Sequence, residues 1–227
     1  DRNSMTTATR LPTYFVSHGG GPWPWIKDSL PGDFRPLERS LQQMARDVHQ
    51  KVKAVLCISA HWLTQGWWLT AMAQPPTIHD FGGFPRELFE QQYPSPGAPQ
   101  LAAELSQLIH QPDGSALSLD DSQWGLDHGT WGVLKPMFPE ADIPVIQLSI
   151  DMSRPTTEHF ALGRQLVSLR DEGVLIVASG NTVHNLRAMQ REAPNGQGYD
   201  WAIEFDTAVA ERIAAGRLDE LPRMREL

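Results

Sequence analysis

The sequence contains one cysteine, Cys57, among its 227 residues. A single cysteine cannot form a disulfide within the chain, and it excludes a zinc site built from several cysteines. Cys57 lies inside the apolar run 53–60, where a cysteine usually packs as a small hydrophobic side chain. A chain of this length can bury a sizeable hydrophobic core without such cross-links.

Positive charge and long apolar runs are also scarce. Nineteen Lys and Arg stand against 27 Asp and Glu, the formal net charge is −8, and no run of five basic residues occurs. Because nucleic-acid phosphates bind clustered Lys and Arg, we expect no nucleic-acid partner. No apolar stretch approaches the roughly 20 residues that cross a bilayer, and no signal-peptide pattern opens the chain. These absences predict a cytoplasmic protein with no membrane partner, and they leave its oligomeric state open.

Strand-like and helix-like segments alternate along the chain. The predicted strands are residues 11–17, 53–60, 67–73, 116–119, 144–150 and 174–179, and the predicted helices are residues 34–50, 86–92, 99–110, 155–171 and 199–215. The strands are apolar along their length, as expected for strands buried on both faces. The pattern predicts an α/β fold with a largely parallel central sheet covered by helices on both faces. We expect one domain over residues 5–227, with residues 1–4 before Met5 as a cloning remnant.

Three histidines share one position relative to the predicted strands. His18 follows the first strand, His61 follows the second, and His184 lies just past the last. Because parallel strands end at the same edge of a sheet, residues beyond their carboxyl ends converge there, where ligands bind in such folds. Neutral imidazole is a common ligand of divalent metals. The three positions therefore predict a metal site held by His18, His61 and His184.

The alternative for any one of these histidines is a side chain satisfied by loop backbone. Three such coincidences at the same kind of position are much less expected than one. The Gly19-Gly20-Gly21 run after His18 favours a tight turn close to a ligand. A phosphate cradle is disfavoured there, because no Lys-Ser or Lys-Thr follows the glycines.

Further residues are candidates for handling protons or binding substrate. His128 stands before a predicted helix, between glycines and tryptophans, and suits a proton handler or substrate contact. His79 lies in a proline-rich loop, where a role at the pocket mouth and a structural role are equally compatible with the pattern. Trp62, Trp131 and Phe81 can supply the flat apolar walls that suit an aromatic ring.

Six stretches, in order over nearly the whole chain, resemble the class III extradiol ring-cleavage dioxygenase family, and within it the 4,5-DOPA dioxygenase-like branch. They are SHGGGP (17–22), SAHW (59–62), PPTIHDFGGFP (75–85), GLDHGTWGVL (125–134), PVIQLSID (144–151) and ASGNTVHNLR (178–187).

The resemblance implies an oxidoreductase that uses non-haem Fe(II) and O2 to open a catechol ring beside, rather than between, its two hydroxyls. His18 and His61 match the two early metal ligands of the family. His184 matches a late active-site histidine that acts as metal neighbour or acid/base, and His128 matches a second pocket histidine near substrate and oxygen. The implied partners are a small DOPA-like or related catechol and O2. Zn(II) can also fill such a site in the purified protein.

The family pattern is incomplete in one respect. Its third metal ligand usually comes from a segment beyond the position where this sequence stops, and no histidine follows His184. Either a C-terminal segment is missing, which we expect, or His184 is the third ligand. Two other functions remain open: a zinc-dependent hydrolase, disfavoured because no HExxH-like arrangement occurs, and a non-catalytic metal-binding protein on the same fold.

Overall fold

The computed structural model describes residues 10–30, 32–194 and 196–226. The chain forms two compact units, the first ending at Gly180 and the second beginning at Asn181. The central sheet belongs entirely to the first unit. The expectation of one domain over residues 5–227 stays a prediction, and residues 1–4 lie outside the described residues.

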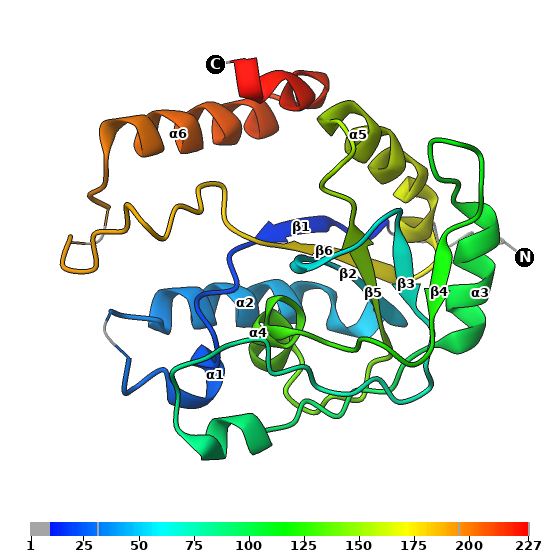
Figure 1. Ribbon diagram of the computed structural model, residues 1–227, viewed down its shortest axis with the longest axis horizontal. Coiled ribbons are helices and arrows are strands. Elements are labelled where there is room, and N and C mark those ends of the chain that lie inside the picture. Colours follow the sequence, from blue (N-terminus) through cyan, green and yellow to red (C-terminus); the bar gives the residue numbers. More distant parts are fainter. Residues whose placement is uncertain (1–9, 31, 195, 227) are drawn as a thin grey trace, which may run out of the picture. The chain divides into compact units, whose positions relative to one another are not determined.

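The core of the first unit is a six-stranded sheet (Figure 1). β1 pairs with β6, β6 with β2, and β2 with β5, all in parallel. β3 runs antiparallel to β5 and parallel to β4. The predicted α/β class with a largely parallel sheet is therefore confirmed. In spatial order the strands are β1 (Thr13–Val16), β6 (Val174–Ser179), β2 (Ala54–Leu63), β5 (Val145–Ile150), β3 (Trp68–Thr70) and β4 (Ser118–Asp120).

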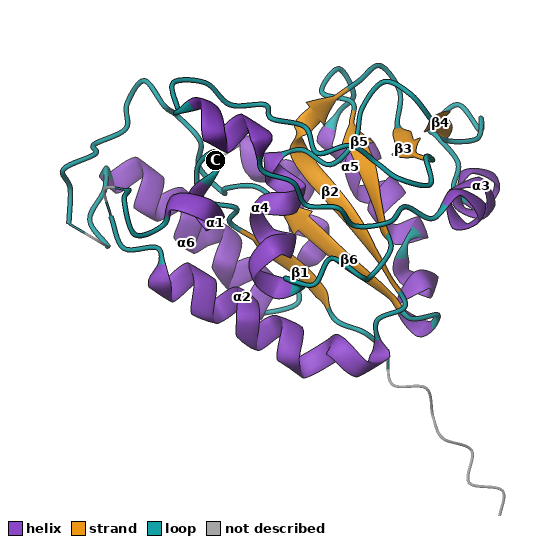
Figure 2. Cartoon of the chain, turned by 90° about the horizontal axis from the view of Figure 1, so that it is seen from below, coloured by secondary structure: helices purple, strands orange, loops and turns teal. Residues whose placement is uncertain are grey.

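Helices cover both faces of this sheet (Figure 2). Successive residues of a strand point to opposite faces, so Val55 and Cys57 join one buried cluster and Leu56 joins the other. The first cluster includes residues of α2 and α4, and the second includes residues of α3 and α5. Burial on both faces explains why the first five residues of β2 are all apolar. The covering helices are α2 (Arg35–Val48), α4 (His128–Met137), α3 (Pro99–Leu108) and α5 (Thr156–Gln165).

The remaining elements are short or belong to the second unit. Among the described residues, no helix is both long and apolar enough to cross a membrane. The second unit contains α6, which begins one residue later and ends one residue earlier than predicted. The elements other than the six strands and the four covering helices are α1 (Trp23–Ile26), the 3-10 helices η1 (His49–Lys51), η2 (Arg86–Glu90), η3 (Val167–Asp171) and η4 (Leu218–Glu226), and α6 (Asp200–Ala214).

Several predicted boundaries need correction. The strand predicted over residues 67–73 covers only Trp68–Thr70, and the helix predicted over residues 86–92 is the 3-10 helix η2. The helix predicted over residues 155–171 is divided, because the backbone N–H of Leu166 bonds to Gly163 three residues back and the chain continues as η3. The second strand extends to Leu63, so His61 lies within β2 instead of after it. The pairing of β2 with β5 shifts register between Ile58 and Leu63. Such a bulge changes the direction of the side chains that it contains, and His61 is one of them.

The buried thiol of Cys57 gives a test of this packing. The side chain is fully buried, and burial raises the pKa of the thiol to about 12. Below that pH the thiol stays protonated, so we expect no reaction of the native protein with a thiol reagent at about pH 8. In denaturing guanidinium chloride the same reagent should label one thiol per chain. Rapid labelling of the native protein would contradict the packing of β2.

Candidate metal centre

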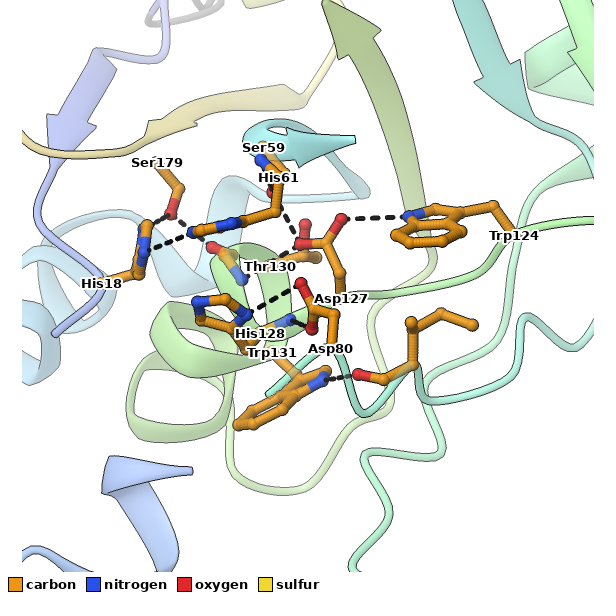
Figure 3. A network of polar contacts seen from close by, with 12 residues as sticks. His18, Ser59, His61, Asp80, Trp124, Asp127, His128, Thr130, Trp131 and Ser179 are labelled. Carbon is orange, nitrogen blue, oxygen red and sulfur yellow. Dashed lines mark hydrogen bonds and ion pairs between the residues drawn. The ribbon is translucent and has the colours of Figure 1, made fainter. Parts of the chain in front are cut away.

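Three histidines from separate segments of the first unit meet beside the carboxyl ends of β1, β2 and β6 (Figure 3). His18 follows β1, His61 lies in the last part of β2, and His128 is the first residue of α4. Their potential ligand nitrogens all lie within 4.8 Å of one another. His18 and His128 are only 2% and 7% exposed. The structure therefore brings two of the three predicted ligands together and adds His128 to them.

The hydrogen bonds around His18 determine which of its ring nitrogens carries the proton. The Nδ1 atom of His18 lies 3.0 Å from the hydroxyl oxygen of Ser179. That hydroxyl donates its one hydrogen to the backbone carbonyl of Gly129, which can only accept. In its contact with His18, the Ser179 oxygen must therefore accept a hydrogen bond, so the hydrogen of the His18 ring is on Nδ1. The lone pair of His18 is then on Nε2, which points into the cluster.

His61 faces His18 directly and is held through its backbone. The two Nε2 atoms lie 2.9 Å apart, a contact that needs one proton between them in the absence of a metal. Because the lone pair of His18 is on Nε2, His61 is the donor. The backbone N–H of His61 donates to the Ser59 hydroxyl oxygen at 3.1 Å. A metal ion that both nitrogens bind would replace the shared proton.

His128 is held by Asp80 from the long loop between β3 and α3. One carboxylate oxygen of Asp80 lies 2.8 Å from Nδ1 of His128, and the other accepts the backbone N–H of His128 at 2.9 Å. Burial raises the pKa of Asp80, but the hydrogen bonds and charge of His128 outweigh it and the net pKa is lowered. Asp80 therefore holds His128 through its backbone N–H and through a close ion-pair contact at Nδ1, which leaves Nε2 on the opposite edge of the ring.

A buried carboxylate connects α4 to the strand that carries His61. Asp127 is fully buried and caps α4, and its oxygens accept hydrogen bonds from the Gly129 N–H and the Ser59 hydroxyl at 3.0 and 2.6 Å. The Trp124 indole and the Gln147 amide also donate to it. Burial raises the pKa of Asp127 despite these donors. The carboxylate holds Ser59, and through it the backbone of His61, against the helix.

These residues fit a divalent cation. In two of the three imidazoles Nδ1 lies 3.0 Å or less from an outer oxygen, that of Ser179 or Asp80, and an outer oxygen partner is usual around metal-bound histidine. The Nε2 atoms of His18 and His61 face one another, and neutral imidazole suits iron and zinc alike. The cluster can therefore hold a metal ion, and the geometry does not select which one.

The comparisons with known proteins decide the family. A model of the catalytic LigB subunit of aromatic ring-opening dioxygenase matches residues 13–227. The chain belongs to this family.

Related proteins agree with the family assignment. A 4,5-DOPA dioxygenase extradiol of Escherichia coli (strain K12) is 42% identical over 227 residues, which are 100% of this chain and 79% of the relative. Another of the same description, from Beta vulgaris, is 37% identical over 211 residues, 92% of this chain and 75% of the relative. The crystal structure of an uncharacterized Escherichia coli K12 protein matches with a TM-score of 0.69 and 40% identity, covering 89% of this chain and 72% of that one.

His184, predicted as a metal ligand or acid/base of this ring-opening dioxygenase, lies in the second unit. The first unit ends at Gly180, and His184 follows four residues later with an exposed side chain. The cluster of His18, His61 and His128 does not include it. The role of His184 therefore stays a prediction.

The predicted substrate-binding residues lie in different environments. Phe81 is partly buried, with its ring 6.0 Å from that of Trp131. His79 is held by the Gln91 carbonyl at 2.7 Å, and Trp62 stacks on Trp124. Trp131 is fully buried and donates its indole N–H to the backbone of Ile78, so it supports the loop that carries Asp80. Contact of any of these side chains with substrate stays a prediction.

Sequence reasoning missed the polar residues that hold the histidines. Ser59, Asp80, Asp127 and Ser179 all lie within the stretches that carry the family resemblance. Asp80 is adjacent to His79 and Asp127 to His128, so a search for acidic neighbours of histidine would have found both. Ser59 and Ser179 carry no such signal, because the contact of Ser59 with Asp127 and that of Ser179 with His18 each join residues far apart in sequence.

The close approach of α4 to β2 predicts a strict requirement at Gly129. A Cβ atom there would lie 2.3 Å from the Ser59 hydroxyl oxygen and 3.2 Å from the His61 ring. We expect Gly129→Ala to lower the free energy of unfolding by about 1–3 kcal/mol and to weaken metal binding. Chemical denaturation and metal titration measure the two effects.

Gly163→Ala is the matched control, because it also lies in a helix and a Cβ there meets nothing within 4 Å. This variant should be as stable as the parent or more so, since alanine favours a helix by about 0.5–1 kcal/mol over glycine. Equal behaviour of the two variants would show that α4 does not pack as described.

Proposed function

We propose that this protein is an extradiol dioxygenase that opens the ring of a DOPA-like or related catechol with O2 at an Fe(II) centre. The observation that carries the proposal is the buried histidine cluster in a member of the ring-opening dioxygenase family. Relatives at 42% and 37% identity are described as 4,5-DOPA dioxygenase extradiol, which supports a DOPA-like substrate. Action in the cytoplasm, without nucleic-acid or membrane partners, belongs to the same proposal.

His18 and His61 are the residues that would hold the metal, because their Nε2 atoms face one another at 2.9 Å. Fe(II) held there would supply the redox chemistry that lets the catechol ring react with O2. The net reaction balances without an external reductant. One ring C–C bond beside the diol breaks, and both atoms of O2 enter the product.

We assign proton transfer to His128. Because Nδ1 lies 2.8 Å from the Asp80 carboxylate, Nε2 is the atom of His128 that would take a hydroxyl proton from the catechol and later return it. The negative charge of Asp80 stabilises the imidazolium that forms, since the two groups lie 2.8 Å apart. Burial of His128 keeps bulk water from competing for that proton.

A zinc hydrolase is the second candidate, because the same imidazoles suit Zn(II). Such an enzyme needs a base to activate water. Two carboxylates beside the cluster are already engaged, Asp80 by His128 and Asp127 by Ser59 and Gly129. The family assignment also favours dioxygen chemistry. A zinc-filled site in purified protein is compatible with either function.

Reconstitution with metal tests the proposal. Metal-free protein loaded anaerobically with Fe(II), then given L-DOPA or a simple catechol and O2, should consume one O2 per catechol and form a yellow ring-opened product. An oxygen electrode and visible spectra follow both. Zn(II)-loaded protein should consume none, because Zn(II) has no redox chemistry.

His18→Ala is the control for iron held elsewhere, and it should lose uptake. The dioxygenase proposal is rejected if Fe(II)-loaded protein, with iron confirmed by metal analysis, takes up no oxygen across a panel of catechols.

Two histidine variants test the proton-transfer assignment. We expect His128→Ala and His184→Ala each to remain folded and to lower turnover by about 100-fold or more, through loss of acid/base catalysis. For His128→Ala, metal binding should persist while turnover falls, and turnover and metal content are measured on the same sample. Loss of the metal would instead make His128 a ligand. Unchanged turnover in His128→Ala would remove the assignment to His128, and unchanged turnover in both variants would remove an acid/base role for either histidine.

A further inference from the structure

We propose that Ser179 is a positioning residue that fixes the tautomer and orientation of His18, so that its Nε2 atom is ready to bind metal. Ser179 is the last residue of β6, is 3% exposed, and lies 161 positions from His18 in sequence. The proposal rests on the proposed function only in taking His18 as a metal ligand.

The direction of the hydrogen bonds carries the first step. A serine hydroxyl has one hydrogen, and here it goes to the backbone carbonyl of Gly129. The lone pairs that remain on Ser179 accept the Nδ1–H of His18. A residue with only donors in this place, or none, would allow the hydrogen of His18 to move to Nε2. His18 would then have no lone pair on the atom that faces His61, and it could not bind a metal ion there.

Burial makes this selection strong. His18 is 2% exposed, so an Nδ1–H without an acceptor would lose its hydrogen bond to water and gain nothing. Without the Ser179 hydroxyl, the ring is expected to turn away or to change tautomer. After either change, the Nε2 lone pair of His18 would no longer point toward Nε2 of His61. The hydroxyl therefore acts on the metal site without touching the metal.

The same hydrogen-bonded chain reaches the second ligand. The carbonyl of Gly129 accepts from Ser179, while its N–H donates to Asp127, which accepts from the hydroxyl that holds the His61 backbone. Figure 3 shows this path from His18 through Ser179 and Asp127 to Ser59 and His61. A single peptide segment at the start of α4 is thus connected to the His18 ring through Ser179 and to the His61 backbone through Asp127 and Ser59.

The experiment measures metal affinity and tautomer together in Ser179→Ala. Zn(II) is the probe, titrated against a chromophoric chelator, because its binding does not require turnover. We expect the dissociation constant to rise by about 10–100-fold, the usual effect of removing the outer partner of a ligand histidine. In metal-free protein, nitrogen NMR of the His18 ring, assigned with His18→Gln, should show hydrogen on Nδ1 in the parent and on Nε2 in Ser179→Ala. Ser179→Thr, which keeps the hydroxyl, should restore both.

Ser106→Ala is the matched control, because the Ser106 hydroxyl is also buried and also donates to a backbone carbonyl, that of Leu117. It should keep parental Zn(II) affinity. The proposal is overturned if Ser106→Ala weakens Zn(II) binding as much, if folded Ser179→Ala binds Zn(II) normally, or if the parent carries hydrogen on Nε2 of His18. The last readout stands even where Ser179→Ala fails to fold. A failed oxygen assay would refute the dioxygenase function while leaving the tautomer and Zn(II) results intact.

Discussion

The histidine cluster depends on how closely the first turn of α4 approaches the carboxyl ends of β2 and β6. Gly129 makes this approach possible, because any side chain there would overlap the Ser59 hydroxyl. The backbone of Gly129 connects to both neighbouring strands. Its carbonyl accepts from Ser179 of β6, and its N–H donates to Asp127, which accepts from Ser59 of β2. The distances among the histidines follow from this contact between one helix terminus and two strands.

Such an arrangement places many polar groups in the interior. Asp127, Gln147, Ser59 and Thr130 are all fully buried, and a buried polar atom without a partner is costly. Here each is paired, with Gln147 accepting from Thr130 while it donates to Asp127. A fully satisfied network of this kind stabilises one arrangement of side chains against others. That rigidity is what a metal site needs, since ligands must be held before the ion arrives.

The two outer partners of the cluster differ in chemistry. Ser179 is neutral and sets the tautomer of His18, which suits a residue that only binds metal. Asp80 is ionised and can stabilise a positive charge on His128, which suits a residue that takes up a proton. The division between metal binding and proton transfer proposed for this dioxygenase follows from that difference.

The amino-acid sequence was sufficient to predict the fold class, because the apolar pattern within each strand or helix shows which of its faces are buried. The positions of β6 and α2 and the importance of His18, His61 and His128 could be predicted from hydrophobic pattern and motif alone. The same reasoning placed His61 after its strand, since nothing in the sequence marks the bulge in β2.

Only the tertiary structure decided what holds the histidines. Ser179 and His18 are 161 positions apart, and Ser59 and Asp127 are 68 apart, so no local pattern records either contact. Local sequence determines which residues become strand or helix, because those preferences act over a few neighbours. Proton positions and ligand directions depend on hydrogen bonds between segments that meet only when the sheet assembles and α4 packs against it.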